Sequence, residues 1–293
     1  MTAKTIYFHA LSPLHIGSGR GTGLIDLPIA RERATGMPIL PGSSIKGVIR
    51  DEAERCLPQE GNKEELINTF FGSADPSAAC AGALSFSDAY LLCLPVRAFK
   101  GTFAWVTCPQ ILKRYARDFP GQTSENRLSC NFGGTVGDAF VHSDGNIWTN
   151  ENGGKVVLED LCFACKISPV VDGWINFLTK EIFANEESWK TAFKDRFVVV
   201  SDEVFNYLAK HCTEVRARIR INDETKIVAA GALWYEESLP AETLLVGLAW
   251  QDDALRKGND LFATLQTLIF NKELQFGGKS TTGLGRMRVF LGE

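Results

Sequence analysis

Long apolar runs are missing from this sequence of 293 residues. No uninterrupted apolar stretch reaches about 18 residues, the length that a membrane-spanning helix needs. The first residues, MTAKTIYFHALSPLHIG, alternate as a strand does and contain no signal-peptide core. We therefore expect a cytoplasmic protein with no membrane partner. With 45% hydrophobic and 23% charged residues, the chain can form a large core in one elaborated domain or two small ones.

The sequence also lacks a disulfide framework and a complete zinc motif. Its eight cysteines are scattered, and several lie in apolar runs, where a thiol behaves as a small hydrophobic group. Cys162 and Cys165 form a single CxxC, but no second CxxC or His-x-x-x-His completes a tetrahedral site. We expect these two thiols to face inward on a strand.

An excess of basic residues is absent as well, since the formal net charge is −4. That value argues against nucleic-acid binding, which needs lysine and arginine to neutralise phosphates. Clustering matters more than the total, and the segment GGKSTTGLGRMRVF carries Lys279, Arg286 and Arg288 without an acid. A locally basic groove on an acidic surface suits a chain whose other faces contact proteins.

Strand and helix patterns interleave along the chain. Residues 5–16 alternate loosely, and a helical pattern follows PGSSIKG, where Ser43 or Ser44 is expected to cap the helix. The segment TEVRARIRINDETKIVAAGALWY alternates on both sides of Asn222–Thr225 and predicts a long hairpin. The class is α+β, most simply a ferredoxin-like or RRM-like sheet with helices on one face and insertions.

Four further segments have clear patterns. Residues 83–96 and 156–167 each predict one strand, and residues 261–276 predict a helix. The region of about 118–155 is rich in Gly, Asn, Ser and Thr, so we expect a surface insertion there.

Two glycine-containing loops are candidates for anion binding. GGKSTTGLGR lacks the spacing of a Walker loop, but its amides and polar side chains suit a run of phosphates; a tight loop before an edge strand is the alternative. PGSSIKG offers a helix start and a lysine, although a capping serine beside a solvated lysine explains it equally. The candidate residues are Ser43, Ser44, Lys46, Gly277, Gly278, Lys279, Ser280, Thr281, Thr282 and Gly283.

His15 and Asp26 are the polar residues best placed for chemistry. Histidine titrates near neutrality, and aspartate can hold a divalent ion or accept a proton. A lone histidine is more often a structural hydrogen-bonding group. Asp26 lies between Ile25 and Leu27 in a glycine-bounded loop, so solvation explains it less easily.

The segment LHIGSGRGTGLIDLPIARERATGMPILPGSSIKGVIRDEAE resembles the N-terminal signature of the RAMP superfamily, specifically of type III-B (Cmr) CRISPR backbone subunits. The resemblance continues in GALSFSDAYLLCLPVR, ALWYEESLP and FGGKSTTGLGRMRV. It implies one elaborated domain over 1–293, with an RRM-like palm, a helical fingers insertion, a β-hairpin thumb at about 203–236 and a glycine-rich loop at 277–285.

The same resemblance implies a function. Copies of the chain would stack along a guide crRNA with other Cmr subunits and cleave a bound single-stranded target RNA at regular intervals. Asp26 would be the cutting residue, with a divalent Mg or Mn ion and no organic cofactor. The roles of His15, Glu236 and Glu237 are less defined. Arg50, Arg216, Arg218 and Arg286 join the loop residues as expected RNA contacts.

Two alternatives remain at this stage. One is a filament subunit in which Asp26 does no chemistry. The other is a RAMP repeat-RNA processing endoribonuclease that works without metal through a histidine. Metal dependence separates the second alternative from the metal-dependent nuclease, and the effect of Asp26→Asn separates the first.

Overall fold

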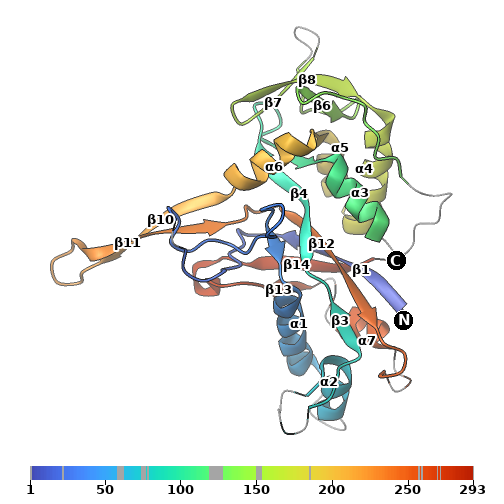
Figure 1. Ribbon diagram of the computed structural model, residues 1–293, viewed down its shortest axis with the longest axis vertical. Coiled ribbons are helices and arrows are strands. Elements are labelled where there is room, and N and C mark those ends of the chain that lie inside the picture. The colour runs from blue at the N-terminus through green and yellow to red at the C-terminus, as the bar shows by residue number, and fades with distance from the viewer. Residues whose placement is uncertain are drawn as a thin grey trace.

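A large mixed sheet forms the centre of the protein in the computed structural model (Figure 1). The structure describes residues 2–21, 23–57, 63–73, 77, 79–118, 128–149, 154–184, 186–256, 258, 260–268, 270 and 272–292. The helices in these ranges are α1 (Gly42–Cys56), α2 (Lys63–Phe71), α3 (Pro109–Asp118), α4 (Pro169–Ile182), α5 (Glu187–Arg196), α6 (Asp202–His211) and α7 (Leu261–Leu268).

The strands follow one path through the sheet, in the order β13-β14-β1-β12-β4-β5-β9-β6-β8-β7. Short β2 pairs with β4, and β3 pairs with β12. The bounds are β1 (Thr2–Ala10), β2 (Ile39–Leu40), β3 (Leu84–Phe86), β4 (Ala89–Arg97), β5 (Phe103–Thr107), β6 (Asp138–Val141), β7 (Lys155–Leu158), β8 (Leu161–Ile167), β9 (Phe197–Val199), β12 (Leu244–Gln251), β13 (Glu273–Gln275) and β14 (Arg286–Leu291). This mixed α/β sheet agrees with the expected palm.

Both faces of the palm sheet are covered. Alternate residues of β1 point to opposite faces, so Tyr7 bonds to Tyr115 of α3 while Phe8 packs edge-on against Phe276. Helices α1 and α7 lie on one side of the sheet, and α3, α4 and α5 gather beyond the other (Figure 1). Burial on both faces explains why β4 is almost continuously apolar and why β1 is buried from Thr5 to Ala10.

The region expected as a surface insertion contributes to the sheet. Residues 138–141 form the fully buried strand β6, which pairs in parallel with β8. The neighbouring residues are rich in Gly, Asn, Ser and Thr, so the sequence pattern did not predict this short strand. Residues 119–127 and 150–153, which belong to the same expectation, lie outside the described residues.

Three other expected elements are divided in the structure. Residues 83–96 split into β3 and β4, and residues 156–167 form the β7–β8 hairpin, with Glu159 in the left-handed region at φ 50°. The helix expected over 261–276 ends at Leu268, because residues 273–275 pair with β14 instead. In each case strand pairing overrides a local pattern.

The start of α1 also differs from the expectation. Pro41 occupies the N-cap position, and neither Ser43 nor Ser44 caps the helix with its side chain. The Asp88 carboxylate, which comes from the break between β3 and β4, accepts a hydrogen bond from the Gly42 amide at 2.8 Å. A carboxylate remote in sequence therefore satisfies one free amide and complements the helix dipole.

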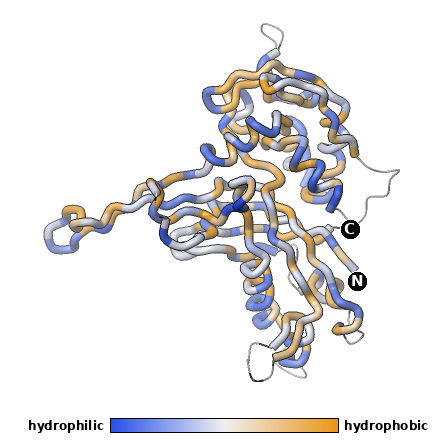
Figure 2. The backbone as a smooth tube through the Cα atoms, in the orientation of Figure 1, coloured by the Kyte–Doolittle hydropathy of each residue, from blue (hydrophilic) through white to orange (hydrophobic). Residues whose placement is uncertain are grey.

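The hairpin expected around Asn222–Thr225 is present and projects from the body of the molecule (Figure 1). It consists of β10 (Glu214–Ile221) and β11 (Val228–Ser238), which pair with each other, while Leu27 bridges to Glu236 near the base of β11. The Asn222 side chain accepts hydrogen bonds from the amides of Glu224 and Thr225 and so holds the turn. Hydrophobic and hydrophilic residues alternate along this arm (Figure 2).

Within the described ranges, no helix combines the length and the apolar character that crossing a bilayer requires. The expected inward orientation of the CxxC thiols is wrong for Cys162, which is exposed on β8, whereas Cys165 is half-buried. Residues three apart on a strand point to opposite faces, so this spacing cannot present both thiols inward.

Candidate functional site

Asp26 lies on the return arm of a narrow loop that begins at Gly17. The arms are joined by a bridge between Gly17 and Ile29, and the Gly21 amide donates to the Asp26 carbonyl at 2.9 Å. Leu24, at the end of the loop, is 96% exposed. The loop is thus a hydrogen-bonded structure that presents its carboxylate at the surface.

The return arm is fixed to strand β11 of the hairpin. The Leu27 amide donates to the Tyr235 carbonyl at 3.0 Å, and the Glu237 amide donates to the Leu27 carbonyl at 3.0 Å. Asp26 Oδ2 accepts the Tyr235 amide at 2.8 Å. Asp26 Oδ1 has no hydrogen-bond donor in the described part of the chain, so it is free to bind a ligand.

His15 contacts β11 at Glu237, two residues after the Tyr235 position that binds Asp26. Its Nδ1 lies 2.6 Å from the Glu237 carbonyl oxygen, which can only accept, so Nδ1 carries the proton. The opposite nitrogen, Nε2, faces Gly17, where an added Cβ would lie only 2.9 Å away. His15 is buried, but the missing side chain at Gly17 leaves Nε2 as an open acceptor.

Glu236 lies between these two anchor points and gathers three donors. Lys279 Nζ and Trp234 Nε1 each donate to Oε1 at 2.7 Å, and Arg218 Nε donates to Oε2 at 3.3 Å. Burial favours the neutral acid, but Lys279, Trp234 and Arg218 together lower the pKa of Glu236 below its ordinary value. Glu236 is therefore an ionised carboxylate with 5% exposure.

Glu237 points to the opposite face of β11 and ties the site to the palm. It forms an ion pair with Arg31, accepts the Thr213 hydroxyl at 2.8 Å and accepts the Ile29 amide at 3.1 Å. Arg31 also donates to the carbonyls of Gly36 and Ala209. This network rigidly joins the Asp26 loop, the hairpin base and the end of α6.

The C-terminal glycine loop completes the arrangement. Its Gly278 amide donates to the His15 carbonyl at 3.0 Å, and a Cβ at Gly277 would lie 2.3 Å from that oxygen. Gly277 also has a φ of +69°, which favours glycine. Three consecutive residues of β11, 235 to 237, therefore hold Asp26, Lys279 and His15 side by side.

Other expected RNA contacts lie apart from this group or are engaged elsewhere. Arg50 pairs with Glu54 and donates to the Gly72 carbonyl, so it points toward α2. Arg286 pairs with Glu273 at 2.6 Å, and Arg216 pairs with Glu214 on the hairpin. Ser43, Ser44 and Lys46 stand at the start of α1. No hydrogen bond among the described residues connects that start to Asp26 or His15.

The chain offers few metal ligands here. No cluster of three or more His, Cys, Asp or Glu residues suited to a metal occurs in the described ranges. Because Glu236 and Glu237 are occupied by cations, Asp26 Oδ1 is the remaining carboxylate oxygen of the group. That donor set fits Mg²⁺, which uses one or two carboxylates and takes further ligands from substrate phosphates and water.

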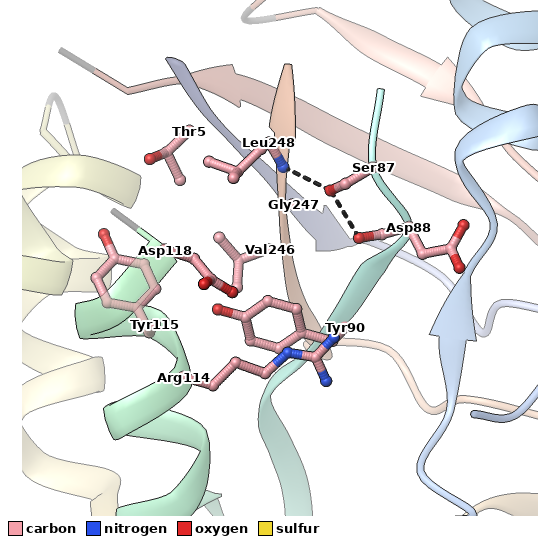
Figure 3. A pocket seen from close by; sticks show the side chains of 10 residues that line it. All are labelled: Thr5, Ser87, Asp88, Tyr90, Arg114, Tyr115, Asp118, Val246, Gly247 and Leu248. Carbon is pink, nitrogen blue, oxygen red and sulfur yellow. Dashed lines mark hydrogen bonds between the residues drawn. The ribbon is translucent and has the colours of Figure 1, made fainter. Parts of the chain in front are cut away.

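A separate cavity of about 280 Å³ opens between the palm sheet and α3 (Figure 3). The Arg114 guanidinium lies 4.1 Å from the centre of the Tyr90 ring, and the buried Thr5 hydroxyl has no hydrogen-bond partner among the residues that the structure describes. None of the expected site residues lines this cavity. This cavity and the candidate site are thus different places.

Some residues of the site carried no distinct signal in the sequence. Arg31 and the Tyr235 amide take part through the pairing of the Asp26 loop with β11, which joins segments more than 200 residues apart. Trp234 takes part through its bond to Glu236 on the same strand. The adjacent glutamates in WYEE were visible, but their opposite directions follow only from the strand geometry.

Comparisons with known proteins agree with this architecture. A relative from Pyrococcus furiosus, named CRISPR system Cmr endoribonuclease Cmr4, is 37% identical over 305 aligned residues, which cover 100% of this chain and 97% of the relative. The crystal structure of oligomeric Cmr4 from the same organism superposes with a TM-score of 0.75 at 29% identity, covering 100% and 98% of the two chains.

A chain from the cryo-EM structure of the type III-B Cmr-beta complex bound to cognate target RNA has the same fold, with a TM-score of 0.74 at 20% identity over 99% and 97% of the chains. The family model for the RAMP superfamily matches residues 7–288. This chain therefore belongs to the RAMP superfamily.

Proposed function

We propose that this chain is the RNA-binding backbone subunit of a type III-B CRISPR effector complex and cleaves the bound target RNA. The observation that carries the proposal is the Asp26 carboxylate, which is fixed to the base of the projecting hairpin and has one oxygen without a donor among the described residues. The full-length similarity to a Cmr4 endoribonuclease supports the same activity.

The projecting hairpin has two chemically different faces suited to a nucleic acid. Arg216, Arg218 and Arg220 alternate along β10 and share one face, where they can meet phosphates. The opposite face carries exposed apolar side chains that can pack against unstacked bases. These apolar residues are Val215, Ile219, Ile221, Val228, Leu233 and Tyr235.

Cleavage would use the 2′-hydroxyl of the target. When the arm holds a nucleotide out of the stack, its 2′-oxygen can attack the adjacent phosphorus in line while the 5′-oxygen leaves. Asp26 Oδ1 and His15 Nε2 are the open acceptors for the 2′ proton or for a hydrogen bond that orients the hydroxyl. The products would be a 2′,3′-cyclic phosphate and a 5′-hydroxyl, with water supplying the proton to the leaving oxygen.

A divalent ion fits beside this carboxylate. Asp26 would hold Mg²⁺ or Mn²⁺ together with phosphate oxygens and water, and the ion would neutralise developing charge on the phosphate. The protein residues supply the position of the strand and the proton acceptor. Guide pairing supplies the sequence specificity, so the protein needs to contact only backbone and shape.

Assembly would occur on the guide RNA in the cytoplasm. Copies of the chain would stack along the crRNA with the other Cmr subunits, and each copy would present one Asp26 loop and one hairpin. A test is electron microscopy of the protein purified with its bound RNA. We expect the images to show repeating subunits on one guide strand. On a denaturing gel, we expect labelled target RNA to give a ladder of evenly spaced products that chelation abolishes.

The outcomes separate the alternatives. Cleavage that persists in excess chelator would favour a metal-independent processing enzyme in which His15 takes the proton. A well-formed filament that never cleaves target would instead be a structural subunit. A chain that binds no RNA would contradict the whole proposal.

A further inference from the structure

Glu236 holds two cations from different elements in one place. Lys279 belongs to the C-terminal glycine loop, and Arg218 belongs to β10 of the hairpin, yet both donate to the same carboxylate. The side chain of Glu236 is 6% exposed, whereas those of Lys279 and Arg218 are 33% and 35% exposed. The carboxylate is hidden below and the two cations reach the surface above it.

The hydrogen-bonding groups of the two cations are only partly used. Arg218 contacts Glu236 through Nε, and no contact of its Nη1 or Nη2 with the described residues is present. The Lys279 ammonium has three N–H groups and directs one of them to Glu236 Oε1. Both side chains therefore retain donors for an anion at the surface. Arg218 offers part of a planar fork that suits phosphate, and Lys279 adds a point charge.

The backbone keeps Lys279 in this position. Lys279 has a φ of +70°, in the left-handed region that a lysine rarely adopts, directly before the short 3₁₀ turn of residues 280–282. The amide of the preceding residue, Gly278, donates to the His15 carbonyl, and the Lys279 side chain reaches Glu236 at the base of the hairpin. Such a conformation persists only where surrounding contacts stabilise it.

We propose that Lys279 and Arg218 together clamp a single phosphodiester of RNA at the base of the hairpin, and that Glu236 is the positioning residue that holds the two cations for it. This inference rests on the proposed function. It adds that the glycine loop and the hairpin act on one phosphate rather than on separate ones, beside the Asp26 loop. The ligand is a phosphodiester of either the guide or the target strand.

The test is interference mapping with the assembled complex. Guide RNAs, and in a second arm target RNAs, carry one neutral methylphosphonate linkage at varied positions, and binding is measured for each position. We expect one linkage per subunit repeat, in one of the two strands, at which neutralisation weakens binding about tenfold, the scale of a charge-assisted hydrogen bond. The strand that responds identifies the source of the phosphate.

Three variants then link that phosphate to the clamp. Lys279→Met and Arg218→Met should each weaken binding of ordinary RNA, and neither should weaken it further when the sensitive linkage is already neutral. Glu236→Gln keeps the size and the hydrogen-bond acceptor but removes the charge that orients both cations. It should weaken binding of ordinary RNA about fivefold and leave binding of the RNA with the neutral linkage unchanged, so that the penalty at the sensitive linkage falls from about tenfold to about twofold.

Arg97→Met is the matched control, because Arg97 is also a surface arginine paired with a glutamate, Glu159, at the far end of β4. Arg97→Met should leave the effect of every neutral linkage on RNA binding unchanged. The proposed clamp is wrong if the effects of Lys279→Met and Arg218→Met on binding disappear at different neutral linkages. It is also wrong if the complex binds RNA well and no neutral linkage weakens that binding. If the unaltered chain binds no RNA at all, the proposed function is refuted instead.

Discussion

At the residue scale, the candidate site depends on hydrogen bonds that leave one atom of each key side chain free. Asp26 uses Oδ2 for the Tyr235 amide, and His15 uses Nδ1 for the Glu237 carbonyl. The remaining atoms, Oδ1 and Nε2, are therefore oriented before any RNA arrives. Preorganisation of this kind reduces the reorganisation that a reaction requires.

Gly17→Ala should impair cleavage while RNA binding is retained. The new Cβ would lie 2.9 Å from His15 Nε2 and would cover this acceptor. If Nε2 contacts the 2′-hydroxyl, we expect the single-turnover cleavage rate to fall about tenfold or more. Gly23→Ala is the matched control in the same loop, because a Cβ there meets nothing within 4 Å. Equal rates for both variants would remove His15 from the reaction.

Glu236 should contribute to the acid sensitivity of the protein. Its pKa in the folded state lies below the ordinary value of 4.5, so its contribution to stability is present above that value and is lost as pH falls through the lower folded pKa. Urea unfolding from pH 7 down to about pH 3 should therefore show a smaller loss of stability for Glu236→Gln than for the unaltered protein. Parallel curves for the two proteins would contradict this assignment.

At the element scale, the sequence predicted element types better than their ends. The hairpin is where alternation on both sides of Asn222–Thr225 placed it, because a solvent-exposed arm is specified by its own pattern. The break between β3 and β4 was missed, since Ser87 and Asp88 are used in tertiary contacts: Ser87 Oγ accepts the Leu248 amide and Asp88 caps α1. Neither partner is close in sequence.

Asp88→Ala should destabilise the protein through α1. The Gly42 amide would lose its acceptor, and the helix dipole would lose a favourable charge. Loss of an N-terminal cap costs about 1 kcal/mol, which chemical denaturation can measure. Ser44→Ala is the control and should change stability by less than about 0.5 kcal/mol, because its side chain caps nothing. A larger loss of stability for Ser44→Ala than for Asp88→Ala would instead support the serine cap that the sequence suggested.

Shortening the hairpin should spare the fold and alter cleavage. Replacing residues 220–232 with Asn-Gly closes β10 and β11 by a two-residue turn and retains Arg218, Trp234 and Glu236. Most of the removed side chains are exposed, so the melting temperature should stay within a few degrees.

Without the arm, target nucleotides would not be splayed, and we expect weaker or irregular cleavage on a denaturing gel with binding largely retained. A normal ladder of products would show that the arm does not set the cleavage geometry. A large loss of thermal stability would show that the hairpin belongs to the core.

At the scale of the whole molecule, the palm brings together segments from both ends of the chain. β1 and β14 are neighbours, so the loop after β1 and the glycine loop before β14 meet at His15 and Gly278. The resemblance to the RAMP superfamily led to these two loops. The pairing with β11 that holds Asp26, and the ion pairs of Glu236 and Glu237, follow from the three-dimensional structure alone.

The net charge of −4 is compatible with RNA binding because the useful cations are gathered locally. Lys279 and Arg218 stand beside the Asp26 loop, while many other arginines are paired with carboxylates elsewhere on the surface. Bulk charge affects long-range attraction, but a site is defined by its local groups. This explains why composition alone pointed away from a nucleic acid.

Asp26→Asn in the assembled complex tests the central claim most directly. Asparagine keeps an acceptor for the Tyr235 amide, so the loop should stay in place and guide and target affinities should remain within about threefold of those of the unaltered complex. The carboxylate charge and its free oxygen are lost, so we predict that the ladder of target products disappears, as we also expect on chelation. Unchanged cleavage by Asp26→Asn, with equal RNA binding, would contradict the account.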